Sequence, residues 1–419
     1  MSEPSLWNHA DFLKLWTGQT ISQFGSVVTR TALPLVALLV LSAGPRELAY
    51  LVVSASLGVL LVGLFAGAWV DRLRRRPLLI VNDLIRAGLL FSVPVAYAIG
   101  ALGIEQLYLV AFLEACLDTL FNSAYPAYVP TLIGVERVVE GNSKLAMSTS
   151  IAEIGGPGLA GTLVQIAGAP FALLVDAASF VVSSISLILI RAPEPARPPR
   201  VMATRIVSEI VEGLGVVRRH AIVFPLMARS VPAHIFGAFY GVLYAIYLLK
   251  ELHLDPFLLG IVISAGGVGS LIGSAFAQRA VRAIGIGPTI VWMAIGASAL
   301  GVLTPLAQGP VALATLMVFI PQLFGDGLQT IENVAELSLV QRLIPDRILG
   351  RVSATLDVIS HGVGYPLGAL AAASVAEVVG LRGAIAVGWA GMAASVLFLV
   401  FSPVRGLRDV SATPTLARS

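Results

Sequence analysis

The chain has 419 residues, of which 57% are hydrophobic and 12% are charged, and its mean hydropathy is +0.89. A water-soluble chain of this length could not cover its surface with so few polar residues, so the composition indicates an integral membrane protein. The formal net charge is +3, but the basic residues cluster between apolar runs and no separate polar domain is present, which argues against a nucleic-acid partner. The single cysteine, Cys116, lies in an apolar run and excludes disulfides and cysteine-based metal sites within the chain.

Apolar runs of about 18 residues or more can cross the hydrocarbon layer as helices, at a rise of about 1.5 Å per residue. Twelve such runs predict an all-α integral membrane fold with twelve transmembrane helices. They lie near 12–41, 48–70, 77–101, 104–130, 142–167, 169–191, 221–250, 256–279, 287–307, 309–340, 350–378 and 380–402. The polar residues 1–11 lack a basic stretch ahead of a cleavage site, so we expect no removable signal peptide.

Basic residues are distributed unequally between the two sets of loops. If the first span starts inside, the outer loops carry only Arg46, Lys250 and Arg382, and the inner loops carry the other basic residues. The positive-inside rule then places both termini in the cytoplasm, and we expect a multi-pass protein of the plasma membrane.

A proline-rich stretch after Arg191 is followed by apolar residues at helical spacing, which predicts a stiff connector and a surface helix. We therefore expect an N-terminal six-helix bundle (1–191), a cytoplasmic linker (192–220), a C-terminal six-helix bundle (221–403) and a cytoplasmic tail (404–419). The two bundles repeat one another, because Ser54 with Gly63 and Ser264 with Gly273 overlay at a constant offset of 210 residues. Such a repeat predicts two pseudo-symmetric halves around a water-filled crevice at the membrane midplane.

The connection between the second and third spans combines two glycines, an acid and a run of arginines. Read from the residues alone, it is a close helix contact followed by arginines that hold the loop on the cytoplasmic side. The stretch also resembles motif A of the major facilitator superfamily, with Arg74 standing where the motif has a glycine. The matching residues are Gly63, Gly67, Asp71, Arg72, Arg75 and Arg76. The resemblance implies that this loop latches the two halves on the cytoplasmic side, with Asp71 at the positive N-terminus of a helix in the second half.

A second segment, with Gly155, Gly156, Pro157 and Gly161, resembles motif C, which is typical of antiporters of the same superfamily. The chain as a whole is most similar to the branch of drug and metabolite exporters that includes macrolide-efflux and enterobactin-exporter proteins. This resemblance implies proton-coupled efflux of a small organic molecule by alternating access. Two departures weaken it in detail: no arginine lies between Leu102 and Gly134, and Asn122 stands where related sequences often have an acid.

Charged side chains inside the spans are the candidates for proton coupling. Each costs at least about 2.5–3.5 kcal/mol on insertion scales, so it should be paired or line a wet cavity. Asp118 and Asp326 are the first choices; Glu114 and Glu332 are the others, because Glu114 lies one turn from Asp118 and Glu332 one turn from Glu336. Structural interpretations stay open: Arg30 paired with Asp118 or Glu114, Asp83 and Arg86 bracing the latch, and Glu336 facing water near a helix end.

Aromatic residues on the fourth and seventh spans predict a cavity for a large amphipathic substrate, although the same residues also suit plain helix packing. The proposed cavity residues are Arg30, Phe121, Asn122, Tyr125, Phe236, Tyr240, Tyr244 and His361. His361 suits either a proton relay or polar packing.

The sequence shows no Walker A loop, no His/Glu pair at metal-ligand spacing and no nucleophile elbow. We therefore expect a transporter rather than an enzyme, without cofactor or metal, that works as a monomer on a small molecule, protons and the lipid bilayer. Two alternatives remain: uptake or exchange of an anion or organic acid with Arg30 and Arg229 as charge partners, and a non-transporting membrane receptor or lipid scramblase.

Overall fold

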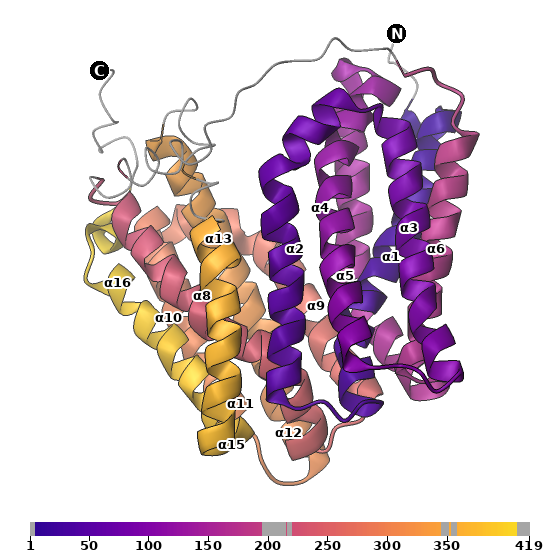
Figure 1. The fold of residues 1–419 in the computed structure, drawn as a ribbon. Coiled ribbons are helices and arrows are strands. Elements are labelled where there is room, and N and C mark those ends of the chain that lie inside the picture. The colour runs from indigo at the N-terminus through magenta and orange to yellow at the C-terminus, as the bar shows by residue number, and fades with distance from the viewer. Residues whose placement is uncertain (1–4, 195–214, 216–219, 345–351, 353–357, 409–419) are drawn as a thin grey trace. The chain divides into compact units, whose positions relative to one another are not determined.

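The computed structural model describes residues 5–194, 215, 220–344, 352 and 358–408, and these residues form helices with no β-strand among them. The chain divides into two compact units, Met1–Ala203 and Thr204–Ser419 (Figure 1). The predicted surface helix of the linker and most of the predicted tail lie outside the described residues, so they stay predictions.

Unit 1 is a bundle of long helices joined by short connections (Figure 1). After the short helix η1 (Leu6–Asn8), its helices are α1 (Ala10–Leu39), α2 (Pro45–Arg72), α3 (Arg75–Ala98), α4 (Ile104–Ile133), the short η2 (Val135–Arg137), α5 (Val138–Ala167) and α6 (Ala169–Leu189). Helix α1 packs on α5 and α6, α2 packs on α4, and α3 packs on α6 and α4. Every helix of the unit therefore contacts α1, α4 or α6.

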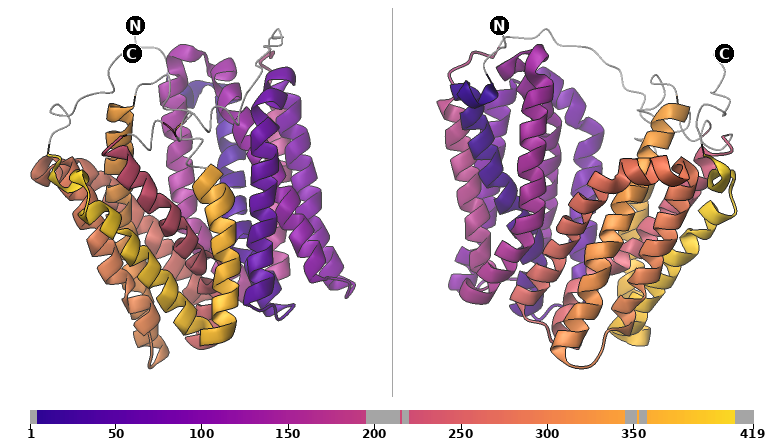
Figure 2. Two further views of the ribbon diagram at one scale, coloured as in Figure 1. Left: turned by 60° about the vertical axis from the view of Figure 1, so that its left-hand side comes forward. Right: turned by 180° about the vertical axis from the view of Figure 1, so that it is seen from behind.

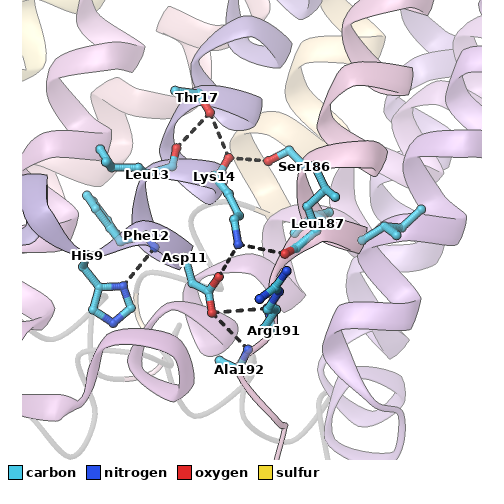
Figure 3. Close-up of polar contacts among 12 residues, drawn as sticks. His9, Asp11, Phe12, Leu13, Lys14, Thr17, Ser186, Leu187, Arg191 and Ala192 are labelled. Carbon is cyan, nitrogen blue, oxygen red and sulfur yellow. Dashed lines mark hydrogen bonds and ion pairs between the residues drawn. The ribbon is translucent and has the colours of Figure 1, made fainter.

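Polar contacts fix the start of α1 to the end of α6 (Figure 3). The Asp11 carboxylate accepts hydrogen bonds from the backbone N–H groups of Arg191 and Ala192 at 3.2 and 3.0 Å. The Lys14 ammonium donates to Asp11 at 2.7 Å and to the backbone carbonyl of Leu189 at 2.9 Å. The Lys14 bond satisfies a carbonyl that the end of α6 leaves without an intrahelical partner, and the Asp11 bonds hold the two residues that follow the helix.

Unit 2 repeats the bundle with more irregular helices (Figure 2). Its elements are α8 (Val223–Ile246), η3 (Tyr247–Glu251), α9 (Pro256–Ile284), α10 (Ile286–Gly301), α11 (Leu303–Leu306), α12 (Val311–Ile320), η4 (Pro321–Gly325), α13 (Asp326–Leu343), η5 (Val358–Gly364), α15 (Tyr365–Ser395), α16 (Leu397–Val400) and η6 (Pro403–Gly406). Helix α15 packs on α8, and α13 packs on α9 and α10. Three of these elements, η3, η4 and η5, are π-helical turns, a geometry that is frequent at functional sites.

The helix bounds agree with most of the predicted spans to within a few residues. Among the described residues, nine segments are long and apolar enough to cross a membrane. The 30-residue helices α4 and α5 are not among these nine, and one segment, Val358–Val400, covers the last two predicted spans. Gly380 interrupts that segment with φ = 78°, close to the predicted boundary. The total of twelve spans stays a prediction.

Large apolar side chains remain exposed on both units, among them Phe91 and Ile185 in unit 1 and Leu271 and Phe276 in unit 2. Exposed apolar surface on this scale is what a bilayer solvates and water does not. The fold is therefore an all-helical membrane protein.

Candidate functional site

The arginines of the motif between α2 and α3 make most of their described contacts inside unit 1. Glu194 caps α3, because its carboxylate oxygens accept the backbone N–H groups of Arg75 and Arg76 at 2.8 and 3.1 Å. The Arg76 guanidinium donates to the carbonyls of Leu187 and Ile188 at the end of α6, at 2.9 and 2.8 Å. Buried Arg75 donates to a backbone carbonyl near the end of α4. These two arginines tie three helix ends together; a latch between the halves through Asp71 stays a prediction, since the Asp71 side chain is outside the description.

The glycine–proline motif of α5 packs against α1. A Cβ atom at Gly156 would overlap the Val27 side chain, and one at Gly155 would contact Phe24. Pro157 and Gly161 are buried inside the same helix. The motif therefore allows α1 and α5 to approach closely within unit 1, and its role at an interface between the halves stays a prediction.

Unit 1 contains a cavity of about 400 Å³ lined by α1 to α5. Its charged lining residues are Arg30, Arg86, Glu114, Asp118 and Glu153, and its polar lining includes Gln19, Gln23 and Asn122. Predicted residues Arg30, Glu114, Asp118, Phe121 and Asn122 all lie in this lining. Tyr125 does not; it stacks on Phe121 and packs against the apolar core of unit 1.

Arg86 of α3 is held by the two carboxylates of α4. Its Nε donates to Glu114 Oε1 at 2.9 Å, its Nη2 donates to the same oxygen, and Nη2 lies 3.2 Å from Asp118 Oδ1. The Arg86 side chain is 5% exposed, Glu114 is 14% exposed and Asp118 is 49% exposed. Asn122 donates to the other Asp118 oxygen at 2.9 Å. One buried cation thus faces one buried and one accessible carboxylate.

This arrangement corrects one sequence-based interpretation. Arg30 pairs with Glu153 of α5, not with Asp118 or Glu114, and both members of that pair are largely exposed, at 62% and 46%. Arg86 lines the cavity, and its bracing of the latch stays a prediction. Spacing along α4 predicts that the two acids share a face, but it does not specify which arginine approaches that face.

Two further carboxylates lie deeper in unit 1, outside the cavity. Asp83 of α3 and Asp176 of α6 have no solvent exposure. Among the described residues, one Asp176 oxygen accepts a hydrogen bond from Ser179 at 2.9 Å, whereas the other Asp176 oxygen and both Asp83 oxygens accept none with full hydrogen-bond geometry. Arg86 lies within electrostatic reach of both acids. The interior of unit 1 therefore holds more acids than its one central arginine can neutralise.

Unit 2 contains a second cavity, of about 370 Å³, lined by α8, α10, α13, α15 and the turns beside them. The predicted residues Tyr240, Tyr244, Asp326 and Glu332 lie in its lining. Phe236 does not, because its ring packs against Gly391 of α15. Tyr365 and Trp389 complete the aromatic lining and had not been predicted from the sequence.

Arg229 of α8 lies beside two carboxylates in unit 2, as Arg86 does in unit 1. It pairs with Glu332 of α13, which is 1% exposed, and lies 3.6 Å from Glu336 one turn further along the helix. Glu336, interpreted from the sequence as facing water near a helix end, therefore also has a cationic partner. In each unit, one arginine is held by two carboxylates one helical turn apart.

Asp326 is the first residue of α13, directly after the π-turn η4. Its carboxylate lies in the cavity lining and against Gly266 of α9, where a Cβ atom would overlap it. No described residue forms an ion pair or a side-chain hydrogen bond with this carboxylate. Among the described residues, Asp326 thus differs from Asp118, Glu114 and Glu332 in having no cation beside its carboxylate.

His361, predicted as a cavity residue, lies on η5 and contacts His234 of α8, with their Nε2 atoms 3.2 Å apart. His234 lines the unit 2 cavity, whereas His361 is outside the described lining. His361 thus lies next to the cavity through its contact with His234. No group of three or more potential metal ligands occurs among the described residues.

Comparison with known proteins identifies the family. The family model of the Major Facilitator Superfamily matches residues 15–369. The chain belongs to this superfamily. The transporter YfiS of Bacillus subtilis (strain 168), an uncharacterised MFS-type protein, is 24% identical over 96% of this chain and 92% of its own. The multidrug efflux pump Tap of Mycolicibacterium fortuitum is 25% identical, over 78% of this chain and 80% of the Tap chain. Macrolide efflux protein A of Streptococcus pyogenes is 23% identical, over 88% of this chain and 90% of that protein.

Solved structures agree on the fold of this superfamily. A bacterial homologue of the iron transporter ferroportin, in its inward-facing state, superposes with a TM-score of 0.72 at 19% identity, over 95% of this chain and 99% of that one. The nucleoside transporter NupG superposes with a TM-score of 0.68 at 13% identity, over 93% and 97%. Membership of the superfamily makes the chain a multi-pass membrane transporter of a small molecule rather than an enzyme.

Proposed function

We propose that this transporter exports small organic molecules in exchange for protons. The observation that carries the proposal is the arginine held by two carboxylates one turn apart at a cavity, present once in each unit. Efflux by Tap and macrolide efflux protein A, its named relatives, supports the direction of transport.

The carboxylate pairs give the protein two charge states. When Asp118 is ionised, it helps hold Arg86, and its 49% exposure leaves it open to protons from water. A bound proton removes that negative charge and weakens the hold on Arg86, because the attraction between opposite charges is strong away from water. The helices α3 and α4 are then free to adopt a second packing, which is the change an alternating-access cycle requires.

In unit 2, the carboxylate that takes up the proton would be Asp326, which is not part of the Arg229 pair. Without a cationic partner among the described residues, its ionised form is favoured only when water or a cationic group of the substrate lies beside it. Protonation neutralises it, so proton and cationic substrate compete for the same carboxylate. Competition of this kind is the simplest way to exchange one for the other.

The aromatic lining of the unit 2 cavity supports a large amphipathic substrate. Tyr240, Tyr244, Tyr365 and Trp389 line the same cavity as Asp326, so apolar contact area and a carboxylate lie together. Pockets that combine aromatic walls with a few placed polar groups bind drug-sized organic molecules.

Anion uptake, the second expectation, receives less support. Arg30 and Arg229 would be its charge partners, yet each is already paired with a carboxylate. An anion would have to compete with Glu332 for the buried Arg229, and with Glu153 for the exposed Arg30. A receptor or scramblase role is disfavoured by membership of a transporter family. Cytoplasmic termini and a monomeric state remain part of the proposal.

Reconstituted protein tests this function directly. Proteoliposomes are loaded with a panel of macrolides and cationic dyes, and efflux is followed with and without an imposed proton gradient. We expect the gradient to accelerate efflux at least several-fold in the parent protein, and to have no effect in Asp118→Asn, which retains gradient-independent exchange. Equal rates with and without the gradient for every compound would reject proton-driven efflux.

A further inference from the structure

A basic hollow of about 730 Å³ lies in unit 2, apart from the aromatic cavity. It forms where α9 ends, α10 begins and η6 follows the last helix. Three arginines line it: Arg282 from the end of α9, and Arg405 and Arg408 from the C-terminal segment. Neither the proposed exchange of protons nor the aromatic cavity uses these residues.

Backbone contacts bring the arginines together from distant parts of the sequence. Gly285 turns the chain between α9 and α10 with φ = 90°, a conformation that side-chain-bearing residues rarely adopt. The Gly287 N–H then donates to the Leu407 carbonyl at 2.9 Å, and a Cβ atom at Gly287 would overlap the Val404 carbonyl. The segment that carries Arg405 and Arg408 is thereby held against the start of α10.

Within the described part of the chain, the arginines of the hollow have no acidic partner. None of the described lining residues is a carboxylate, and no ion pair to Arg282, Arg405 or Arg408 occurs among the described residues. Like charges gathered around one concavity repel each other, so a bound anion would stabilise the arrangement. Guanidinium groups match the planar geometry of phosphate oxygens, which they bind with paired hydrogen bonds.

The remainder of the hollow is apolar and lies at a membrane surface. Helices α9 and α10 are both candidate spans, so the connection between them emerges from the bilayer. Trp292, Ile284 and Val400 line the hollow beside the arginines, and the Trp292 side chain is 61% exposed. Tryptophan is enriched at the level of lipid headgroups, and basic pockets between spans bind anionic headgroups.

We propose that this hollow binds an anionic phospholipid, with the headgroup phosphate at the three arginines and an acyl chain along Trp292 and Val400. A free phosphate ion would match the arginines but would leave the apolar wall without a partner. The combination of both surfaces in one hollow therefore favours the lipid.

Quenching by brominated lipids tests the proposal on the purified full-length protein. Brominated phosphatidylglycerol and brominated phosphatidylcholine are titrated into detergent micelles, and the signal of Trp292 is obtained by subtracting Trp292→Phe. We expect brominated phosphatidylglycerol to quench Trp292 more strongly than brominated phosphatidylcholine does. This preference for phosphatidylglycerol should fall about fivefold in each of the variants Arg282→Gln, Arg405→Gln and Arg408→Gln. Salt at about 1 M should suppress it, because exposed charges are then screened.

Arg279→Gln is the matched control. Arg279 lies one turn before Arg282 on α9, stacks on Phe276 and does not line the hollow. We expect it to keep the parent preference, and we expect all four variants to keep the parent unfolding midpoint in phosphatidylcholine micelles.

Three outcomes would overturn the proposal. These are equal quenching by both lipids, a preference retained when all three arginines are replaced, or displacement of the lipid by millimolar inorganic phosphate. The last would show a site for a free anion. None of these results depends on proton coupling, so the inference stands or fails independently of the proposed exchange.

Discussion

Replacement of Arg86 by glutamine tests the charge arrangement of unit 1. The Arg86 side chain is 5% exposed and contacts Glu114 through Nε at 2.9 Å and Asp118 through Nη2 at 3.2 Å. Glutamine removes the positive charge and leaves Glu114, 14% exposed, beside the buried Asp83 and Asp176 without a cation. The variant therefore isolates the contribution of one buried cation.

The expected magnitude follows from burial. Removing one partner of a buried ion pair costs about 3–5 kcal/mol, because the other charge stays buried and unpaired. Arg30→Gln is the matched comparison: its pair with Glu153 is 62% and 46% exposed, and exposed pairs contribute about 0–1 kcal/mol. We therefore expect Arg86→Gln to be more destabilising than Arg30→Gln by at least about 2 kcal/mol.

The assay is reversible unfolding of the purified variants in mixed micelles, monitored by circular dichroism. A double variant, Arg86→Gln with Glu114→Gln, completes a mutant cycle and should recover part of the lost free energy, since the unpaired carboxylate is then gone. The reasoning would be refuted by equal losses for Arg86→Gln and Arg30→Gln, or by a double variant less stable than Arg86→Gln alone.

Two further substitutions test other features of the structure. Gly266→Ala should destabilise unit 2 by about 1–3 kcal/mol and impair transport, because the added methyl group overlaps the Asp326 carboxylate. Gly88→Ala, in open space on α3, is its control, and an equal loss of stability there would contradict the close contact. Outside the spans, hydrogen bonds from the Leu6 N–H and the Ser5 hydroxyl, together with Lys144 and Arg137, lower the pKa of Glu140. A lowered pKa stabilises the fold above the ordinary pKa of glutamate, about 4.3, and this stabilisation is lost as pH falls through the lowered value. The melting temperatures of the parent and Glu140→Gln should therefore differ at pH 7, and the difference should shrink as the pH falls below the ordinary pKa of about 4.3; a difference that stays constant at every pH below that value would exclude this role.

The helices themselves were predictable from the sequence because the thickness of the bilayer fixes the length of an apolar run. The sixth predicted span, 169–191, corresponds to Ala169–Leu189, and the eighth, 256–279, begins at the first residue of α9. The tenth, 309–340, was expected as one run, but π-turn η4 separates α12 from α13 inside it. A uniformly apolar composition conceals such a turn, although Pro321 at its start is a signal for a local break.

Side-chain partners were less predictable than helices. Spacing predicted that Glu114 and Asp118 share one face, as do Glu332 and Glu336, and in each pair both acids reach the same arginine. It did not predict that Arg86 rather than Arg30 faces the first pair, because spacing along α4 fixes which residues share a face but not which neighbouring helix that face meets.

The positions of the aromatic side chains were also only partly predictable from the sequence. Tyr240 and Tyr244 line the unit 2 cavity as expected, whereas Tyr125 and Phe236 pack against their own units. Along an apolar helix, an aromatic ring suits a cavity wall and a helix contact equally well. Only the neighbouring helix decides between them.

The central claim is that carboxylates in the cavities carry protons against the movement of substrate. Its most direct test is the proton flux in liposomes that contain a trapped pH-sensitive dye and transported substrate, diluted into substrate-free buffer without a proton gradient. As substrate leaves, the interior should acidify in the parent protein and stay unchanged when Asp118 and Asp326 are both replaced by asparagine. Substrate efflux from the parent protein with no acidification would contradict the account.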